Sequence, residues 1–384
     1  LDRLFKDRKK IMSKMLGRNK EIDALFNPSY SNYQKIVSNL DDESIILSYN
    51  LAEDSGKLIA LKSNKTFFIS IDESSDIINF NIRRLRHSMT AGTDFDFEAA
   101  HNLYNILIEP VNSILGNIKN IYLYGSDLED LPFGVLLSNY HELDQFSSDY
   151  EKLVNTSWLI ESFSFARIFP LSNNKLNKEY DRKFLGLANP DSFDVLGLPL
   201  LPNAEEEVRQ IALASKSYSQ DSILINSNAS KTNLRNKLTN SYERIIFSTH
   251  SLPPNWNGIT SESSLVLSDE MGDYLLTATE IVNMDFRSDM IVLSSCNTEI
   301  KGSDSLYKAF LVAGSNSVMY SNWELETISA SKITDTVFKS MLFDDAPKHI
   351  ALQNASIKLM NDYSNRDYAH PGFWGNFSIA YRNL

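Results

Sequence analysis

The C-terminal half of the chain alternates short apolar runs with amphipathic helical patterns, and this alternation constrains the fold more than any other feature. Strand-like runs are expected at residues 184–188, 222–225, 242–249, 290–294 and 317–321. Helical periodicity is expected at residues 204–217, 231–238, 303–313, 328–341 and 348–362. Strands and helices in alternation imply right-handed crossovers and a mostly parallel sheet covered on both faces. The sequence therefore predicts an α/β fold.

The N-terminal half has a different pattern of apolar and polar residues. Runs at residues 45–51, 58–61 and 66–71 alternate or are apolar, which predicts an antiparallel β-meander. A helical stripe at 96–115 and a buried strand at 118–124 then add an α/β segment.

The domain boundary is expected in the polar stretch 172–183, after Pro170. Three parts follow from this placement: a basic helical entry segment at 1–40, a supporting half at 41–175 and an α/β domain at 176–384. The chain starts with leucine rather than methionine, so we expect it to be a fragment or to be processed, with a module upstream.

Charge is distributed unevenly along the chain. The net charge of −12 argues against a protein that coats duplex nucleic acid, and no direct nucleic-acid partner is predicted. Residues 1–20 nevertheless carry eight Lys or Arg against two Asp. A solvated helix face explains this basic segment; the alternatives are docking on the acidic body, on an upstream domain or on an anionic partner.

The chain has one cysteine, Cys296, which excludes an internal disulfide and any zinc site with two thiolates. The six histidines show no metal-ligand spacing, and the glycines form no phosphate-binding loop, so neither metal nor cofactor is expected. No apolar run reaches the roughly 18 residues that cross a bilayer. We expect a cytoplasmic protein without membrane contact.

Two strand ends carry reactive side chains. The run at 244–250 ends in His250, and the run at 290–296 ends in Cys296. Because carboxyl ends of parallel strands meet at one sheet edge, an imidazole and a thiol are expected there together. Such a base raises the thiolate fraction of a thiol whose free pKa is about 8.5, which suits acyl transfer. The alternative is that Cys296 is a small core residue and His250 a structural one.

Six ordered segments resemble the CHAT family of caspase-like cysteine peptidases, related to separase and caspases. They are Phe-Ser-Thr-His at 247–250, Ser-Leu-Val-Leu-Ser at 264–268, Leu-Thr-Ala-Thr-Glu-Ile at 276–281, Val-Leu-Ser-Ser-Cys-Asn-Thr at 292–298, Ala-Phe-Leu-Val-Ala-Gly at 309–314 and Ser-Asn-Trp at 321–323. Flanking blocks extend the resemblance from about residue 40 to the end. It implies a caspase-like, mostly parallel sheet flanked by helices and preceded by a β-rich and α/β pseudo-catalytic half.

The resemblance also assigns residue roles. His250 matches the family's catalytic histidine and Cys296 its nucleophile, and the backbone N–H groups of Ser251 and Cys296 would hold the oxyanion. Two positions depart from the common pattern: Ser251 stands where glycine is usual, and Ser295 where alanine is frequent. We expect activity to survive both changes.

Glu324 falls where separase-like sequences carry an acidic residue, with Glu326 nearby. As a substrate-binding residue, Glu324 would favour Arg or Lys at the cleaved position. The alternative is that both glutamates are first-turn charges on the helix that follows.

The resemblance implies a cysteine endopeptidase that cleaves a protein substrate. Family members commonly follow an upstream repeat domain or bind an activating protein, and several act in prokaryotic, including antiviral, defence or regulated cell death. The alternative is a regulatory scaffold that keeps the CHAT fold without peptidase activity.

Overall fold

The computed structural model describes residues 37, 39–90, 92–125, 127–129, 131–169, 180, 183–214, 222–268, 271–294, 306–323 and 326–384. Its strands are β1 (Ser44–Leu51), β2 (Gly56–Lys62), β3 (Lys65–Ile71), β4 (Asn120–Tyr124), β5 (Ser164–Ile168), β6 (Phe184–Ala188), β7 (Ile223–Ile225), β8 (Tyr242–Ser248), β9 (Ser251–Leu252), β10 (Ser264–Val266), β11 (Leu275–Thr277), β12 (Ser288–Leu293), β13 (Ser317–Ser321) and β14 (Phe377–Tyr381).

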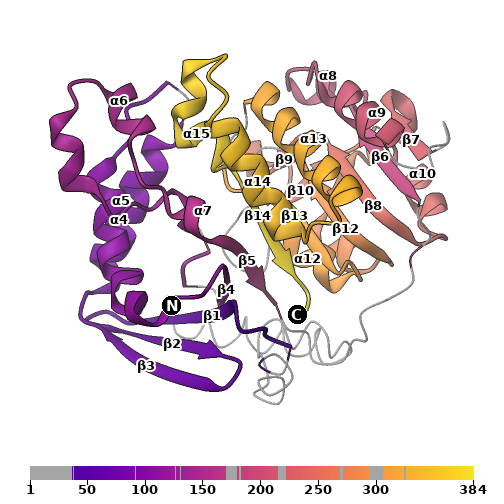
Figure 1. Cartoon of the computed structure of the whole chain (residues 1–384). Coiled ribbons are helices and arrows are strands. Elements are labelled where there is room, and N and C mark those ends of the chain that lie inside the picture. The colour runs from indigo at the N-terminus through magenta and orange to yellow at the C-terminus, as the bar shows by residue number, and fades with distance from the viewer. Residues whose placement is uncertain are drawn as a thin grey trace.

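Helices cover this framework on two sides (Figure 1). They are α4 (Ser75–Ser88), α5 (Phe97–Leu107), α6 (Asp149–Val154), α7 (Leu159–Ser162), α8 (Phe193–Leu196), α9 (Ala204–Ala214), α10 (Lys231–Lys237), α11 (Ala278–Val282), α12 (Leu306–Val312), α13 (Thr327–Phe343), α14 (Lys348–Met360) and α15 (Pro371–Trp374), with short 3-10 turns between several of them.

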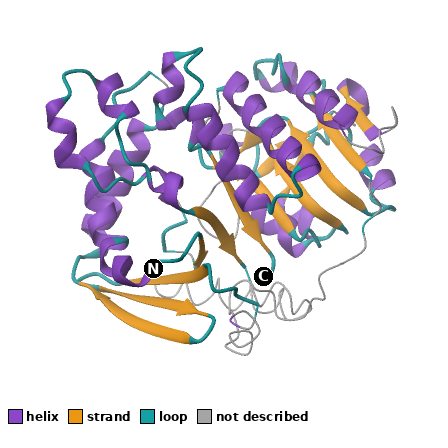
Figure 2. Ribbon diagram, viewed as in Figure 1, coloured by secondary structure: helices purple, strands orange, loops and turns teal. Residues whose placement is uncertain are grey.

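The described strands form an eleven-stranded sheet in the order β3-β2-β1-β4-β5-β14-β13-β12-β8-β6-β7. Strands β13, β12, β8, β6 and β7 run parallel to one another, which confirms the predicted parallel block. Strands β1, β4 and β5 form a second parallel block, and β14 joins the two, parallel to β5 and antiparallel to β13. The two blocks therefore run in opposite directions, and their carboxyl ends open at opposite edges of the sheet (Figure 2).

Neighbouring residues of the central strands face different cores, which explains why these runs are apolar throughout. In β8, Ile246 packs in a core shared with α9, α13 and α14, whereas Ile245 and Phe247 pack in a core with α11 and α12. All three are fully buried. A strand that is covered on both faces has no solvent side on which polar residues would alternate.

The antiparallel meander predicted at the N-terminus is confirmed, since β1, β2 and β3 pair in register as successive antiparallel strands. The helix expected at 96–115 is shorter than predicted. Helix α5 ends at Leu107, and a 3-10 turn (Glu109–Ile114) follows with Pro110 in its first turn. Proline lacks the N–H that would continue an α-helix, which accounts for the break.

The insertion between β8 and β12 holds a small second sheet that the sequence did not predict. Its order is β11-β10-β9, all antiparallel. Strands β5 and β14 and helix α4 were also not anticipated. The basic segment at 1–20 and most of the expected boundary at 172–183 lie outside the described residues. Within the part of the chain that is described, no helix is long and apolar enough to cross a membrane.

Candidate active site at the carboxyl ends of β8 and β12

His250 lies two residues beyond the end of β8, and the small sheet fixes its backbone. The carbonyl of His250 accepts a hydrogen bond from the N–H of Val266 at 2.9 Å. The hydroxyl of Thr249 donates to the carbonyl of Val266 at 2.7 Å. Ser251 follows as the first residue of β9 and pairs with Leu265 of β10. The strand-end position predicted for His250 is therefore confirmed.

The imidazole of His250 is oriented by two contacts. Its Nε2 lies 2.8 Å from the carbonyl oxygen of Pro199, and its ring meets the Phe193 ring edge-on with centroids 4.6 Å apart. A carbonyl only accepts, so Nε2 carries the hydrogen and Nδ1 is the basic nitrogen of the neutral ring. Burial lowers the pKa of His250, and the Pro199 carbonyl partly opposes this shift. The neutral form, which can take a proton, is thereby favoured.

Beneath these strand ends lies a buried carboxyl group that sequence reasoning missed. Glu207 of α9 is 6% exposed. The hydroxyl of Ser248 donates to its Oε2 at 2.7 Å, and that of Ser294 donates to its Oε1 at 2.9 Å. Burial raises the pKa of Glu207, and hydroxyl groups including these two partly oppose the rise.

His250 and Glu207 line the same small cavity, whose volume is about 40 Å³. Its other lining residues are Leu201, Asn203, Ala204, Ser248, Thr249, Ser294, Thr327, Ala330 and Ser331. The cavity lies between the ends of β8 and β12 and the first turns of α9 and α13. Its wall is mainly small and hydroxyl-bearing side chains.

Two predicted site residues, Cys296 and Glu324, lie outside the described residues. Strand β12 ends at Leu293, paired with Phe247 of β8, and the described chain continues to Ser294. Glu326 is described: its carboxylate accepts the N–H groups of Ile328 and Ser329 at 3.0 and 2.7 Å and so caps α13. Glu326 is therefore the N-cap of α13, one position before the first turn in which the alternative placed it.

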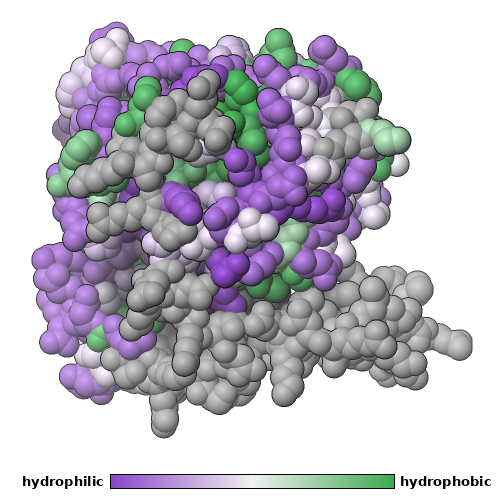
Figure 3. All heavy atoms as spheres, turned by 90° about the vertical axis from the view of Figure 1, so that its right-hand side faces the viewer, coloured by the Kyte–Doolittle hydropathy of each residue, from purple (hydrophilic) through white to green (hydrophobic). Residues whose placement is uncertain are grey.

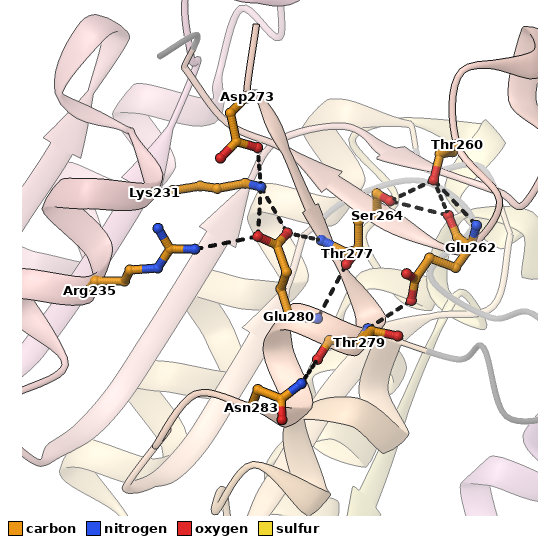
Figure 4. A network of polar contacts seen from close by, with 10 residues as sticks. All are labelled: Lys231, Arg235, Thr260, Glu262, Ser264, Asp273, Thr277, Thr279, Glu280 and Asn283. Carbon is orange, nitrogen blue, oxygen red and sulfur yellow. Dashed lines mark hydrogen bonds and ion pairs between the residues drawn. The ribbon is translucent and has the colours of Figure 1, made fainter. Parts of the chain in front are cut away.

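A buried cation anchors the small sheet that supports His250 (Figure 4). The side chain of Lys231 at the start of α10 is 2% exposed, and its ammonium group lies 2.8 and 2.9 Å from the two carboxylate oxygens of Glu280. Asp273 is its second partner, and Arg235 reaches Glu280 at 3.4 Å. The Glu280 carboxylate also caps α11 through the N–H of Thr277 at 3.0 Å. This network ties α10 to the β10–β11 hairpin.

Exposed apolar residues include two that neighbour cavity-lining residues in the chain. Leu200 is 69% exposed and precedes Leu201, while Ile328 is 52% exposed and follows Thr327. Val195 of α8 is 66% exposed. Of the residues that Figure 3 colours, most are hydrophilic, and several hydrophobic ones lie in the upper part. Among the described residues, no group of three or more His, Asp or Glu is arranged to hold a metal ion.

The family model described as the CHAT domain matches residues 98–383. No curated protein matches the sequence. Among solved structures, the Arg-specific cysteine proteinase gingipain R is similar at 10% identity, covering 80% of this chain and 73% of that chain with a TM-score of 0.45. A complex of the pro- and mature domains of RgpB from Porphyromonas gingivalis gives a TM-score of 0.44. The Saccharomyces cerevisiae separase–securin complex is similar at 10% identity and a TM-score of 0.47, over 90% of this chain and 30% of that chain.

Proposed function

Because the chain belongs to the CHAT domain family, we propose that it is a cysteine endopeptidase that cleaves a partner protein with a dyad of Cys296 and His250. One observation supports this most directly. The imidazole of His250 lies just beyond the end of β8 with Nε2 donating to the Pro199 carbonyl, which leaves Nδ1 as the unprotonated nitrogen that can act as a base. The neighbouring parallel strand β12 ends at Leu293, three residues before Cys296 in the sequence.

In this mechanism Nδ1 of His250 takes the thiol proton, and the thiolate of Cys296 attacks the substrate carbonyl. The oxyanion is held by the backbone N–H groups of Ser251 and Cys296. The C–N bond then breaks, His250 returns the proton to the leaving amine, and a thioester remains. His250 next activates a water molecule, which hydrolyses the thioester and restores the thiol.

The substrate is a protein segment in extended form, for which the exposed Leu200 and Ile328 beside the cavity offer apolar contacts. Glu324 is the proposed substrate-binding residue that selects Arg or Lys at the position before the cleaved bond. We assign residues 41–175 the role of a supporting half that transmits activation from an upstream module or bound protein. Activation by an upstream module or a bound protein would suit a cytoplasmic role in prokaryotic defence.

N-terminal proteomics tests the peptidase directly. A lysate, with and without candidate activators, is incubated with wild type, Cys296→Ala and His250→Ala. New protein termini in the wild-type sample alone are the expected result, and the residue before each cut tests Glu324. A Glu324→Gln variant should lose cleavage after Arg and Lys while Cys296 still reacts with an electrophilic probe. New termini that persist with Cys296→Ala would contradict the proposal.

The second candidate is a regulatory scaffold with the same fold. It predicts that Cys296→Ala keeps the full biological output together with folding and partner binding. The His250 geometry disfavours it, since a scaffold needs no oriented, partly buried imidazole at a strand end.

A further inference from the structure

The two hydroxyl groups that bind Glu207 hold equivalent positions relative to the proposed dyad. Ser248 lies two residues before His250, and Ser294 lies two residues before Cys296. Ser248 is the last residue of β8, and Ser294 directly follows the adjacent parallel strand β12. They donate to different oxygens of one carboxyl group, at 2.7 and 2.9 Å. We call Ser248, Glu207 and Ser294 the carboxyl bridge.

The carboxyl bridge is unlike an ordinary core contact. Glu207 lies on the apolar stripe of α9 with Ala204, Val208 and Ile211, all buried. A buried carboxyl group opposes folding unless it is hydrogen-bonded, and a leucine would fill such a position at no desolvation cost. In the part of the chain that the structure describes, no cation forms an ion pair with Glu207. Its described side-chain partners are the hydroxyl groups of Ser248 and Ser294 at the two strand ends.

The carboxyl bridge also lies at the proposed active site, beside His250. Glu207, Ser248 and Ser294 line the cavity together with His250. Two residues of chain span at most about 7 Å, so a shift of either serine is passed directly to the dyad residue that follows it. Catalysis by a thiol and an imidazole is sensitive to shifts of this kind.

We propose that Glu207 is a positioning residue for the dyad, because its carboxyl group fixes the spacing of the two strand ends that carry His250 and Cys296. This inference rests on the proposed function. It deepens that function by naming a residue that acts through the two strands and touches no substrate.

Cys296 is the only cysteine of the chain, so any thiol alkylation by iodoacetamide reports on that residue. The rate is measured from pH 5 to pH 10 on folded protein, with unfolding temperatures measured in parallel. A thiol coupled to an imidazole forms thiolate well below the free pKa of about 8.5. His250→Ala gives the uncoupled reference profile.

Three variants test the bridge. Glu207→Leu removes both hydrogen bonds, and Glu207→Gln keeps the shape and two polar contacts. The triple variant Glu207→Leu, Ser248→Ala, Ser294→Ala leaves no buried hydroxyl unpaired, which maintains folding if Glu207→Leu alone does not fold. Glu206→Leu is the matched control, because Glu206 is the exposed neighbour on the same helix.

We expect Glu207→Leu and the triple variant to lose at least tenfold in alkylation rate at pH 6 and to approach the His250→Ala profile. Glu207→Gln should stay near wild type, and Glu206→Leu should match it. A lower unfolding temperature with an unchanged profile in the triple variant would overturn the positioning role alone. A wild-type profile identical to that of His250→Ala would overturn the proposed dyad, and the positioning role with it.

Discussion

The carbonyl oxygen of Pro199 and Nε2 of His250 are 2.8 Å apart, although the two residues are far apart in the sequence. Pro199 lies in the segment between α8 and α9, and His250 follows β8. This single contact selects one tautomer of the imidazole, because the carbonyl accepts and the ring nitrogen must donate.

The tautomer can be measured by nitrogen NMR on protein labelled at histidine, using Cys296→Ala to remove the thiolate charge. At pH 7.5 the ring of His250 should be protonated at Nε2 and unprotonated at Nδ1. Because burial lowers its pKa, His250 should become charged only below the usual value of 6.5. A ring protonated at Nδ1, or a pKa above 6.5, would contradict the geometry.

The buried ion pair between Lys308 and Glu129 should be strongly coupled. Lys308 of α12 lies 2.7 and 2.8 Å from the two carboxylate oxygens of Glu129, in the loop that follows β4. Their side chains are 11% and 3% exposed. Lys308→Met alone leaves a buried charge and should lower the free energy of unfolding by about 3–5 kcal/mol.

Lys308→Met combined with Glu129→Leu should recover most of that loss in denaturant titrations. The exposed pair Lys339 and Asp335 is the control, and Lys339→Met should cost less than about 1 kcal/mol. A double variant as unstable as Lys308→Met would show that the two charges are not coupled. Strong coupling would supply a physical link between the supporting half and α12.

Gly186 sets how closely α9 approaches the sheet. A Cβ atom at this position of β6 would lie 2.2 Å from Cγ1 of Val208, next to Glu207 in the chain. Gly186→Ala should therefore cost about 1–3 kcal/mol in denaturant titrations, as overpacking does. Adding Val208→Ala should restore much of it. Gly116→Ala is the control, since a Cβ there meets nothing within 4 Å; equal costs at both glycines would refute the packing argument.

His349 should make stability depend on pH. It is buried between the hydroxyl groups of Tyr122 and Tyr381, and burial lowers its pKa to about 4; Asp41 partly opposes the shift and Lys348 adds to it. Between pH 6.5 and 4, the imidazole of His349 is protonated in the unfolded chain but remains neutral in the folded chain. Stability from this site is therefore present above pH 6.5 and is lost as the pH falls.

The loss amounts to about 3 kcal/mol across that interval. Denaturant titrations at pH 4.5 and pH 7 on wild type and His349→Gln measure it. Wild type should lose more stability than the variant on acidification. Equal losses would mean that His349 is protonated normally in the folded chain.

The sequence predicted the parallel block well because burial on both faces leaves a plain signal in β6, β8, β12 and β13. It did not predict β5 or β14, which are five residues long and lack that signal. Arg167 also makes β5 hard to predict, because a charged residue is not expected in a buried strand. It is nevertheless buried, and its guanidinium donates to the carbonyl of Glu129 at 2.8 Å. A partner of that kind is supplied by the tertiary fold.

The site was predictable only in part. His250 was found because a polar cluster follows an apolar strand. The Pro199 carbonyl could not be found, because every residue has one. Glu207 stands in a run of three glutamates at the start of α9, which suggests a solvated first turn. Its spacing of three residues from Ala204 and four from Ile211 places it on the apolar stripe. This spacing can be read from the sequence, so the burial of Glu207 could have been predicted.

The position of β14 has a consequence for synthesis of the protein. This strand, residues Phe377–Tyr381, lies between β5 and β13 in the middle of the sheet, yet it follows all the other described strands of that sheet in the chain. Until it emerges, the two parallel blocks have no strand to join them, and β5 and β13 each present an unpaired edge. A nascent chain therefore cannot complete its central sheet until Tyr381 has been translated, so the two parallel blocks fold first as separate, incompletely paired sheets.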